Sequence, residues 1–484
     1  MAERIRPDIC VVGAGAGALQ AAMQVAAFGV GVVLVDPPGV RPRPQGGEAV
    51  RTGRLPLSAL IGAAKRAHDA AQAPALGVRA GPIDVDFARV REHVENVLRA
   101  RAPNLARERL AGLGVRVIEG AARFRNADTL VVAGDIEIAA RRFVVATGSS
   151  SAVPPIAGLE GTPYLTAETV FDLTVCPAHL IVIGASAAGL EFAQAFRRLG
   201  APVTVLDAVG PLEDEDSECA AVVLDQLARE GIQIRSGTIA SAAAHAQTEI
   251  QSEIHVLLAH AGGEETIVGS HLLVASGRWA NVVGLGLDAA GIKYDEHGIA
   301  VDKGLKTTNK RVYAIGDVTD GRKPAHAAQH EASLVVRNAL FRLPVKHDPE
   351  AVPRVTFTDP ELAQVGLTEA VARQRGRQVR VLRWPYREND RAHAEGEARG
   401  HIKLVINKRG RILGVTIVGA GAGELITVWT LAIDRHIDVS AVAGIVVPYP
   451  TLGEIGKAAA STYFIGSLTS SRVRRIIAWL RRFG

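Results

Sequence analysis

Two stretches of the chain share one pattern of apolar and polar positions. Residues 8–12 and 179–183 are almost wholly apolar, and each run leads into a turn of small residues and then into a helical pattern. A second apolar run follows each helical pattern, at residues 32–35 and 203–206. Short continuous apolar runs bounded by turn residues are typical of buried strands. The pattern therefore predicts two strand-helix-strand units, which begin about 170 residues apart.

The first turn has small residues where a bound dinucleotide needs them. Gly13 and Gly15 permit a tight turn and a close approach of the backbone to a pyrophosphate, and Ala18 is small enough to pack the helix on the strand. The unpaired N–H groups and the positive end of the helix dipole favour an anion at this helix N-terminus. Asp36 ends the next strand, where it is placed to accept hydrogen bonds from a ribose hydroxyl. This combination predicts a dinucleotide site.

The second unit has the same organisation with one change. Gly184, Ser186 and Gly189 occupy the three glycine positions, and Asp207 ends the following strand. The Asp207 carboxylate would accept a hydrogen bond from a free 2′-hydroxyl and would repel a 2′-phosphate, and no arginine follows it in residues 208–211. We therefore expect NADH rather than NADPH. The alternative is that this unit has lost nucleotide binding and survives as a scaffold.

Composition and charge limit the class of protein. A chain of 484 residues with 48% hydrophobic content can bury several cores, and this length favours about three domains. The formal charge of +5 is concentrated in the last fourteen residues, which hold five arginines and no acid. No basic stripe with interleaved aromatic residues is evident elsewhere, so nucleic-acid binding is not expected. The sequence shows neither a targeting segment nor an apolar run of about 20 residues, which predicts a cytoplasmic protein.

The C-terminal residues 468–484 predict a basic amphipathic helix. Its arginines lie opposite an apolar face that consists of Val473, Ile476, Ile477, Leu480 and Phe483. Such a helix is suited to lie on an anionic membrane surface, which would place the protein peripherally on the inner face of the cytoplasmic membrane. The alternatives are that the apolar face packs on the protein's own dimer or on another protein, including a membrane protein.

Four further segments give the chain a family resemblance. They are VVATGS at residues 144–149, LLVASGR at 272–278, TNKRVYAIGD at 308–317 and VPRVTFTDPELAQVGLTEA at 352–370. With the two dinucleotide fingerprints, they make the chain resemble the class I pyridine nucleotide-disulfide oxidoreductases, which include dihydrolipoamide dehydrogenases, glutathione reductases and mercuric reductases. The resemblance implies an α/β fold with two dinucleotide-binding, Rossmann-like domains, one for FAD and one for NAD, and a C-terminal α+β dimerisation domain.

The resemblance also implies domain bounds, cofactors and the residues that hold them. It predicts an FAD domain at 1–152 and 276–345, an NAD domain at 153–275, a dimerisation domain at 350–465 and the helix at 468–484. The protein is expected to be a homodimer that binds FAD and NADH. The residues expected to bind these cofactors are Gly13, Gly15, Ala18, Asp36, Gly46, Gly47, Ala146, Thr147, Gly148, Gly184, Ser186, Gly189, Asp207, Gly277, Arg278, Gly316 and Asp317.

The redox-active disulfide loop of this family keeps its frame here but not its cysteines. The frame is GG-x-C-x-x-x-G-C-x-P-S-K, and its two cysteine positions hold Ala49 and Arg54. Thiol-disulfide exchange requires one thiolate to attack and another to leave, which neither residue can do. Cys10, Cys176 and Cys219 show no paired spacing. The chain is therefore not expected to be a disulfide reductase.

A second departure concerns a cation near the flavin. The lysine that the family places two residues after the conserved proline is Ser58 here, whereas its usual partner glutamate is retained as Glu191. Arg54 is a candidate replacement for the missing cation, which would stabilise anionic reduced flavin or hold an anionic acceptor. The alternative is that Arg54 and Arg51 neutralise Glu48 or the FAD pyrophosphate in a repacked loop.

A third departure lies in the segment that completes the partner subunit's active site in this family. The family stretch H-P-T-L-S-E reads YPTLGE here, so Tyr449 replaces the acid-base histidine and Glu454 is retained. A phenol has an ordinary pKa near ~10 and is a poor base at neutral pH, but it can donate a hydrogen bond. His326 and His330 have no further ligands nearby, so no metal site is expected.

Together these features predict an FAD-dependent NADH oxidoreductase that passes electrons through the flavin to a non-disulfide acceptor. A quinone is the preferred acceptor because it needs no thiol. The candidate catalytic residues are Ala49, Arg54, Ser58, Glu191, Tyr449 and Glu454. One alternative is pyridine-nucleotide transhydrogenation, against which Asp207 argues. Another is a flavoprotein without turnover that serves as a binding or redox-sensing partner of a membrane complex.

Overall fold

The computed structural model describes residues 3–37, 54–79, 81–105, 107–247, 252–260, 263–319, 323–465 and 471–483. The chain forms two compact units. Unit 1 consists of Met1–Ala67, Ile83–Ala208 and Thr238–Asp348. Unit 2 consists of His68–Pro82, Val209–Gly237 and Pro349–Gly484.

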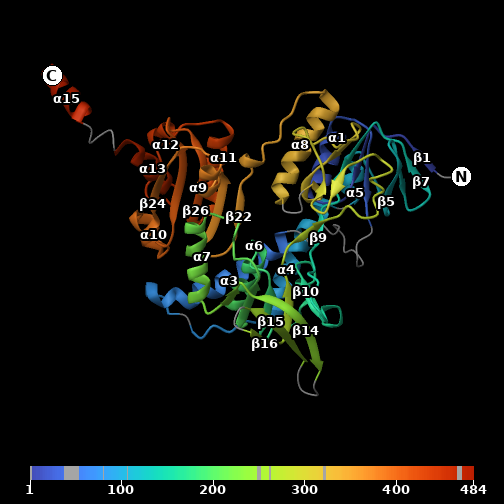
Figure 1. The fold of residues 1–484 in the computed structure, drawn as a ribbon, viewed down its shortest axis with the longest axis horizontal. Helices are drawn as coiled ribbons and strands as arrows, with labels where there is room; N and C mark the ends of the chain where they lie inside the picture. The colour runs from blue at the N-terminus through green and yellow to red at the C-terminus, as the bar shows by residue number, and fades with distance from the viewer. Residues whose placement is uncertain are drawn as a thin grey trace. The chain divides into compact units, whose positions relative to one another are not determined.

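The first strand-helix-strand unit forms the centre of a five-stranded parallel sheet in unit 1. Its strands lie in the order β21 (Val312–Ala314), β8 (Arg142–Val145), β2 (Ile9–Val12), β3 (Val32–Asp36) and β4 (Val115–Glu119). Helices α1 (Ala16–Ala27) and α8 (Ala325–Phe341) pack against each other beside this sheet (Figure 1). Gly17 permits their close approach, because a Cβ there would lie 3.0 Å from the Ala328 side chain.

Both faces of this sheet are covered, which explains its continuous apolar runs. Ile9 and Val11 of β2 pack in one cluster with residues of α1 and α8. Cys10 and Val12 point to the opposite face, where they pack with residues of a smaller sheet. That sheet has the order β1 (Glu3–Ile5), β7 (Ile136–Ile138), β6 (Thr129–Val132) and β5 (Ala122–Asn126).

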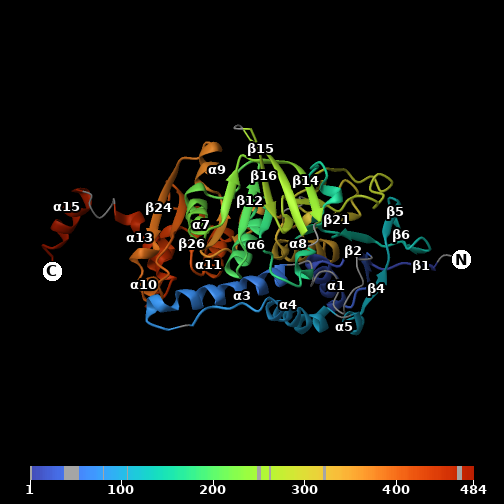
Figure 2. The ribbon, with the colours of Figure 1, turned by 90° about the horizontal axis from the view of Figure 1, so that it is seen from below.

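The second strand-helix-strand unit also lies in a sheet of unit 1. Its parallel strands follow the order β10 (Tyr164–Thr166), β17 (His271–Val274), β11 (Leu180–Ile183) and β12 (Val203–Asp207), and α6 (Ala187–Arg198) connects β11 to β12. A separate antiparallel sheet follows β12 in the chain and is seen in Figure 2. It contains β14 (Ile239–Gln247), β15 (Ser252–His260) and β16 (Gly263–Gly269).

Unit 2 is built on a five-stranded antiparallel sheet. The strand order is β22 (Arg354–Thr356), β23 (Glu361–Gly366), β26 (Ile412–Gly419), β25 (His401–Asn407) and β24 (Val379–Pro385). Helices that pack against it are α7 (Ser217–Arg229), α11 (Ala422–Asp434) and α13 (Glu454–Ser461). The chain ends in α15 (Ser471–Leu480). No helix in the described part of the chain is long and apolar enough to cross a membrane.

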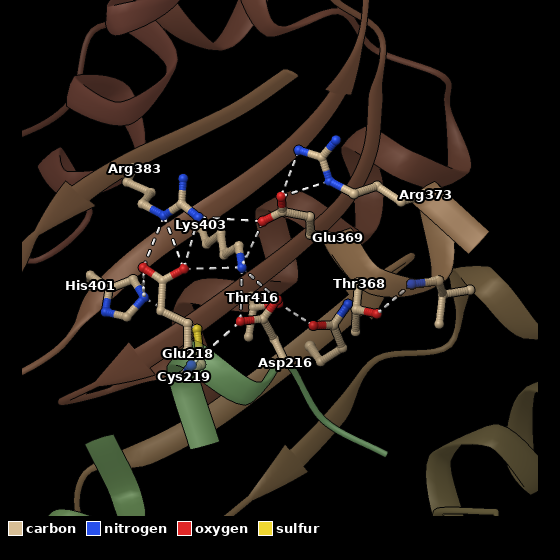
Figure 3. Close-up of polar contacts among 12 residues, drawn as sticks. Asp216, Glu218, Cys219, Thr368, Glu369, Arg373, Arg383, His401, Lys403 and Thr416 are labelled. Carbon is tan, nitrogen blue, oxygen red and sulfur yellow. Dashed lines mark hydrogen bonds and ion pairs between the residues drawn. The ribbon is translucent and has the colours of Figure 1, made fainter. Parts of the chain in front are cut away.

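Lys403 of β25 joins this sheet to α7 (Figure 3). Its Nζ donates to both carboxylate oxygens of Asp216, at 3.0 and 2.8 Å, and the two side chains are only 5% and 4% exposed. Asp216 is also the N-cap of α7, where it accepts the backbone N–H of Cys219. Removing one partner of such a pair leaves a buried charge without compensation. The position of α7 on the sheet therefore depends on this pair.

Two further carboxylates extend the pair into a network (Figure 3). Lys403 Nζ also lies 3.1 Å from Glu218 Oε2 and 3.0 Å from Glu369 Oε2. Arg383 donates to both of these carboxylates. The hydrogen bond from Arg383, together with that from Lys403, lowers the pKa of Glu218 to about 2. The Glu218 carboxylate therefore stays ionised far below neutral pH.

We expect Lys403→Met to destabilise unit 2 by about 3–5 kcal/mol at neutral pH, because it leaves Asp216 charged and buried. The pKa of Glu218 falls from 4.5 to about 2 on folding, so its contribution is complete above pH 4.5 and is lost as pH falls towards 2. Lys403 contributes part of this lowering, so the corresponding part of the penalty should shrink over that range. Chemical denaturation at several pH values measures it, with Lys408→Met at an exposed lysine as control. A neutral-pH penalty below about 1 kcal/mol, typical of a surface pair, would contradict this role.

Candidate functional site

The turn after β2 has the shape that a pyrophosphate site needs. Gly13 has a φ of +120°, and a Cβ there would lie 2.2 Å from the carbonyl oxygen of Ala146. Gly15 is the N-cap of α1, and a Cβ built on it meets nothing within 4 Å. Ala18 is buried, as its role between helix and strand requires. Gly13 therefore closes the turn, while Gly15 leaves open space at the positive end of α1.

The neighbouring strands bring the other predicted FAD residues to the same edge of the sheet. Asp36 ends β3, and Ala146, Thr147 and Gly148 directly follow β8, so all of them lie at the carboxyl ends of strands that flank β2. Ligands of open α/β sheets bind at this edge. Thr147 is fixed by two hydrogen bonds to Asn281, whose side chain donates to the Thr147 carbonyl while the Thr147 hydroxyl donates to the Asn281 carbonyl.

The segment after β21 is held by a buried carboxylate that the sequence did not single out. Glu331 of α8 is buried, and its Oε2 accepts the backbone N–H of Gly316 at 2.7 Å. Lys323 neutralises this carboxylate at 2.8 Å from Oε1. The backbone N–H of Lys323 donates to Asp317. Glu331 thus fixes the turn that carries Asp317, and only the fold reveals this link.

Asp317 is also connected to the predicted cofactor residue Arg278. The Ser149 hydroxyl donates to Asp317 Oδ2 at 2.5 Å, and Arg278 Nε donates to the same hydroxyl at 2.6 Å. Arg278 Nη1 pairs with Glu168 at 2.9 Å. This chain of contacts fixes the strands that connect the two nucleotide units.

The second turn repeats the geometry of the first. Gly184 has a φ of +106°, and a Cβ there would lie 2.6 Å from the Ala275 carbonyl oxygen. Gly189 also requires glycine, since a Cβ would lie 2.1 Å from the Gly184 carbonyl oxygen. Ser186 is the N-cap of α6, and its hydroxyl accepts the Gly189 N–H and donates to the Ala275 carbonyl. Asp207 Oδ2 accepts the backbone N–H of Ala185 at 2.6 Å, which holds the carboxylate beside the turn.

Arg54 and Glu191 meet in an ion pair across unit 1, although 137 residues separate them. Arg54 is the first residue of α3 (Arg54–Gln72), and its Nη1 lies 2.6 Å from both carboxylate oxygens of Glu191. The Glu191 side chain is 0% exposed and that of Arg54 is 42% exposed. Ser58 lies one helical turn further along and is exposed, and its hydroxyl donates to the Arg54 carbonyl. The structure thus brings together the two residues that the sequence proposed as a relocated pair.

Of the remaining candidate catalytic residues, the structure describes Tyr449 and Glu454. Ala49 lies outside the described residues, as do Gly46 and Gly47. Tyr449 and Glu454 lie in unit 2, where the Tyr449 hydroxyl donates to Asp390 Oδ2 at 2.8 Å and Glu454 Oε2 accepts the Thr451 N–H. Within the described ranges, no group of three or more His, Cys, Asp or Glu side chains could hold a metal ion.

The open space at Gly15 gives a test of the FAD site. Gly15→Ala should fold normally, because its Cβ meets nothing within 4 Å. It should weaken FAD binding by about tenfold, or ~1.4 kcal/mol, because the methyl group occupies the approach of the pyrophosphate. FAD titration into the deflavinated protein measures this effect. Gly62→Ala, which also meets nothing within 4 Å, is the control. Equal FAD affinity in Gly15→Ala and the parent would contradict the assignment.

Comparisons with known proteins agree with this geometry. Residues 7–332 match the family described as pyridine nucleotide-disulphide oxidoreductase, and residues 352–460 match the dimerisation domain of that family. The chain is 36% identical over 464 residues to the dihydrolipoyl dehydrogenase of Thermus scotoductus, an alignment that covers 92% of this chain and 95% of the relative. It is 33% identical over 472 residues to a mercuric reductase of Streptomyces lividans, with 94% and 96% covered.

Solved structures show the same fold. The HOCl-induced flavoprotein disulfide reductase RclA from Escherichia coli, as its Cu(II) complex, has a TM-score of 0.82 and 26% sequence identity, and 94% of this chain and 99% of RclA are covered. The expected α/β fold with FAD, NAD and dimerisation domains is thereby confirmed. The chain belongs to the pyridine nucleotide-disulphide oxidoreductase family, whose members are FAD-dependent oxidoreductases that use NADH or NADPH and carry a dimerisation domain.

Proposed function

We propose that this protein is an NADH oxidoreductase that passes electrons through FAD to a non-disulfide acceptor, with a quinone preferred. The observation that carries the proposal is the Arg54–Glu191 ion pair. Arg54 stands at the second cysteine position of the family's disulfide loop, so a guanidinium occupies the place of a thiol. One similar solved structure is that of a flavoprotein disulfide reductase. The arginine in place of the cysteine is the reason to assign a different acceptor here.

The three cysteines of the chain do not supply the missing thiol chemistry. Cys10 and Cys219 are buried, and burial raises the pKa of each thiol far above its usual value. Cys176 is half-buried, and burial raises its pKa as well. Because the thiolate is the reactive form, all three are poor nucleophiles at neutral pH. This supports an acceptor that needs no thiol.

The chain's own residues contribute binding and electrostatics. FAD, when bound, supplies the redox chemistry by accepting a hydride from the nicotinamide and passing electrons on. Gly13, Gly15 and the N-terminus of α1 would hold its pyrophosphate. Asp207 would accept a hydrogen bond from the NADH ribose, and its charge would repel the 2′-phosphate of NADPH. Arg54 would stabilise negative charge that develops on the reduced flavin or on the acceptor.

The ion pair also explains why the family lysine is dispensable in this chain. A buried carboxylate such as Glu191 needs a compensating cation. Arg54 and Ser58 are four residues apart on α3, so they lie on one face of the helix. We infer that the cation has moved one turn towards the helix N-terminus, to the position where a cysteine would stand against the flavin.

Arg54→Ala is expected to lower the flavin reduction potential if Arg54 stabilises the reduced flavin. If Arg54 stabilises negative charge on the acceptor, the same change is expected to slow reoxidation by a quinone about tenfold, which corresponds to ~1.4 kcal/mol. Adding Ser58→Lys to Arg54→Ala should recover part of both, because the cation returns to the turn where the family places it. Spectroelectrochemistry and stopped-flow reoxidation measure the two effects. Unchanged potential and unchanged acceptor kinetics in Arg54→Ala would contradict a role in electron transfer.

We further propose that α15 lies on an anionic membrane surface, close to the membrane pool of quinone. Ile476, Ile477 and Leu480 of this helix are at least half exposed, as is Trp479. Arg474 and Arg475 belong to the same helix, and Arg481 and Arg482 follow it, without any acid between residues 471 and 483. Exposed apolar side chains with a basic face are typical of helices that lie in the interface of an anionic bilayer.

Removing residues 468–484 should reduce binding to vesicles that contain anionic phosphatidylglycerol by at least about tenfold, because both the apolar face and the arginines are lost. Sedimentation with vesicles measures this, and uncharged phosphatidylcholine vesicles serve as the control. Equal binding of the full chain and the shortened chain would eliminate the membrane role of α15. The NADH oxidoreductase activity should not change in detergent solution.

A further inference from the structure

Tyr449 has a hydrogen-bond partner that no family motif indicates. Its side chain is 71% exposed, and its hydroxyl donates to Asp390 Oδ2 at 2.8 Å. Asp390 is the first residue of α10 (Asp390–Glu395), 59 residues earlier in the chain. Asn389, the N-cap of this helix, donates through its side chain to the Thr451 carbonyl at 3.0 Å. The start of α10 and the loop that carries Tyr449 are therefore joined by two hydrogen bonds.

The pair borders a cavity of about 330 Å³ in unit 2. Trp384 provides an aromatic wall, while Glu454 and Lys457 of α13 contribute charges. Glu454 is engaged through Oε2 by the backbone N–H of Thr451. The Tyr449 hydroxyl is thus an exposed polar group at a cavity large enough for a small ring system.

The direction of the Tyr449 hydrogen bond is fixed by chemistry. A phenol has one hydrogen to donate and two lone pairs to accept with, whereas an ionised carboxylate only accepts. The single hydrogen is committed to Asp390, and a bond to an ionised carboxylate is stronger than one to a neutral oxygen. The hydrogen bond to Asp390, followed by the charges of Asp390 and Glu454, raises the pKa of Tyr449 above its usual value. The phenol therefore stays protonated and offers only lone pairs to another ligand.

We propose that Asp390 is a positioning residue that makes Tyr449 a hydrogen-bond acceptor in the electron-acceptor site. This rests on the proposed function and on the family resemblance, which implies that the segment of Tyr449 completes the active site of the partner subunit. A quinone that presents only carbonyl oxygens gains no hydrogen bond from Tyr449, because both groups are acceptors. A quinone that carries an N–H or O–H group beside its reducible ring does gain one. The pair thus selects the class of quinones that bring their own hydrogen-bond donor.

The test compares two neutral quinones on the oxidised holoenzyme. In the parent protein, the Kd of 2-amino-1,4-naphthoquinone should be lower than that of 2-methyl-1,4-naphthoquinone. In Asp390→Ala this preference should fall about tenfold, because the freed Tyr449 hydroxyl can then donate to a carbonyl. Tyr449→Phe should lose the preference, and adding Asp390→Ala to it should change nothing further. Glu388→Ala removes a different carboxylate from the cavity lining and should keep the parental ratio.

A second measurement does not depend on any quinone. Tyr449 is titrated by following phenolate absorbance against pH in the parent and subtracting the same curve for Tyr449→Phe. In Asp390→Ala the pKa of Tyr449 should fall towards its ordinary value, because the carboxylate that raises it is gone. An unchanged titration, or a changed titration with an unchanged Kd ratio, would overturn the proposal. If quinones bind with the expected preference but are never reduced, the proposed function fails, while the selection of ligands by Asp390 and Tyr449 stands.

Discussion

The proposed chemistry of this protein depends on the compensation of one buried carboxylate. Glu191 is 0% exposed, and a carboxylate in that position must be paired or protonated. In this chain the partner is Arg54, which reaches both oxygens at 2.6 Å from the first turn of α3. The same guanidinium occupies a position that holds a reactive cysteine in the family's disulfide loop. In the proposed function, this one interaction replaces the lost ion pair and takes the place of a thiol of the disulfide loop.

Each unit also has supports of its own. In unit 1, Glu331 and Lys323 fix the turn of Gly316 and Asp317, and Gly13 and Gly184 permit the two nucleotide turns. In unit 2, the buried Lys403–Asp216 pair holds α7 on the antiparallel sheet. Each support is a charge or a backbone group that becomes unsatisfied when its partner is removed. Removing one of these partners should lower the stability of the fold, whereas removing Arg54 should change the electron-transfer chemistry.

The sequence was most informative where the physics is local. Gly13, Gly184 and Gly189 were predictable because a turn between strand and helix has few solutions, and the structure shows that a Cβ at any of them would collide with backbone. The ion pair of Arg54 with Glu191 was proposed only through the family resemblance, since 137 residues separate the partners. Asp390 and Glu331 were missed, because a single carboxylate far along the chain gives no pattern until the fold places it.

Anaerobic stopped-flow absorbance of the flavin tests most directly whether electrons pass from NADH to a quinone rather than to a disulfide. The protein is first mixed with NADH and then, in separate runs, with 2-methyl-1,4-naphthoquinone or with oxidised lipoamide. We expect NADH to bleach the flavin, the quinone to restore its colour and the disulfide to leave it bleached. A flavin that stays oxidised with NADH, or that oxidised lipoamide reoxidises as fast as the quinone does, would contradict the proposed activity.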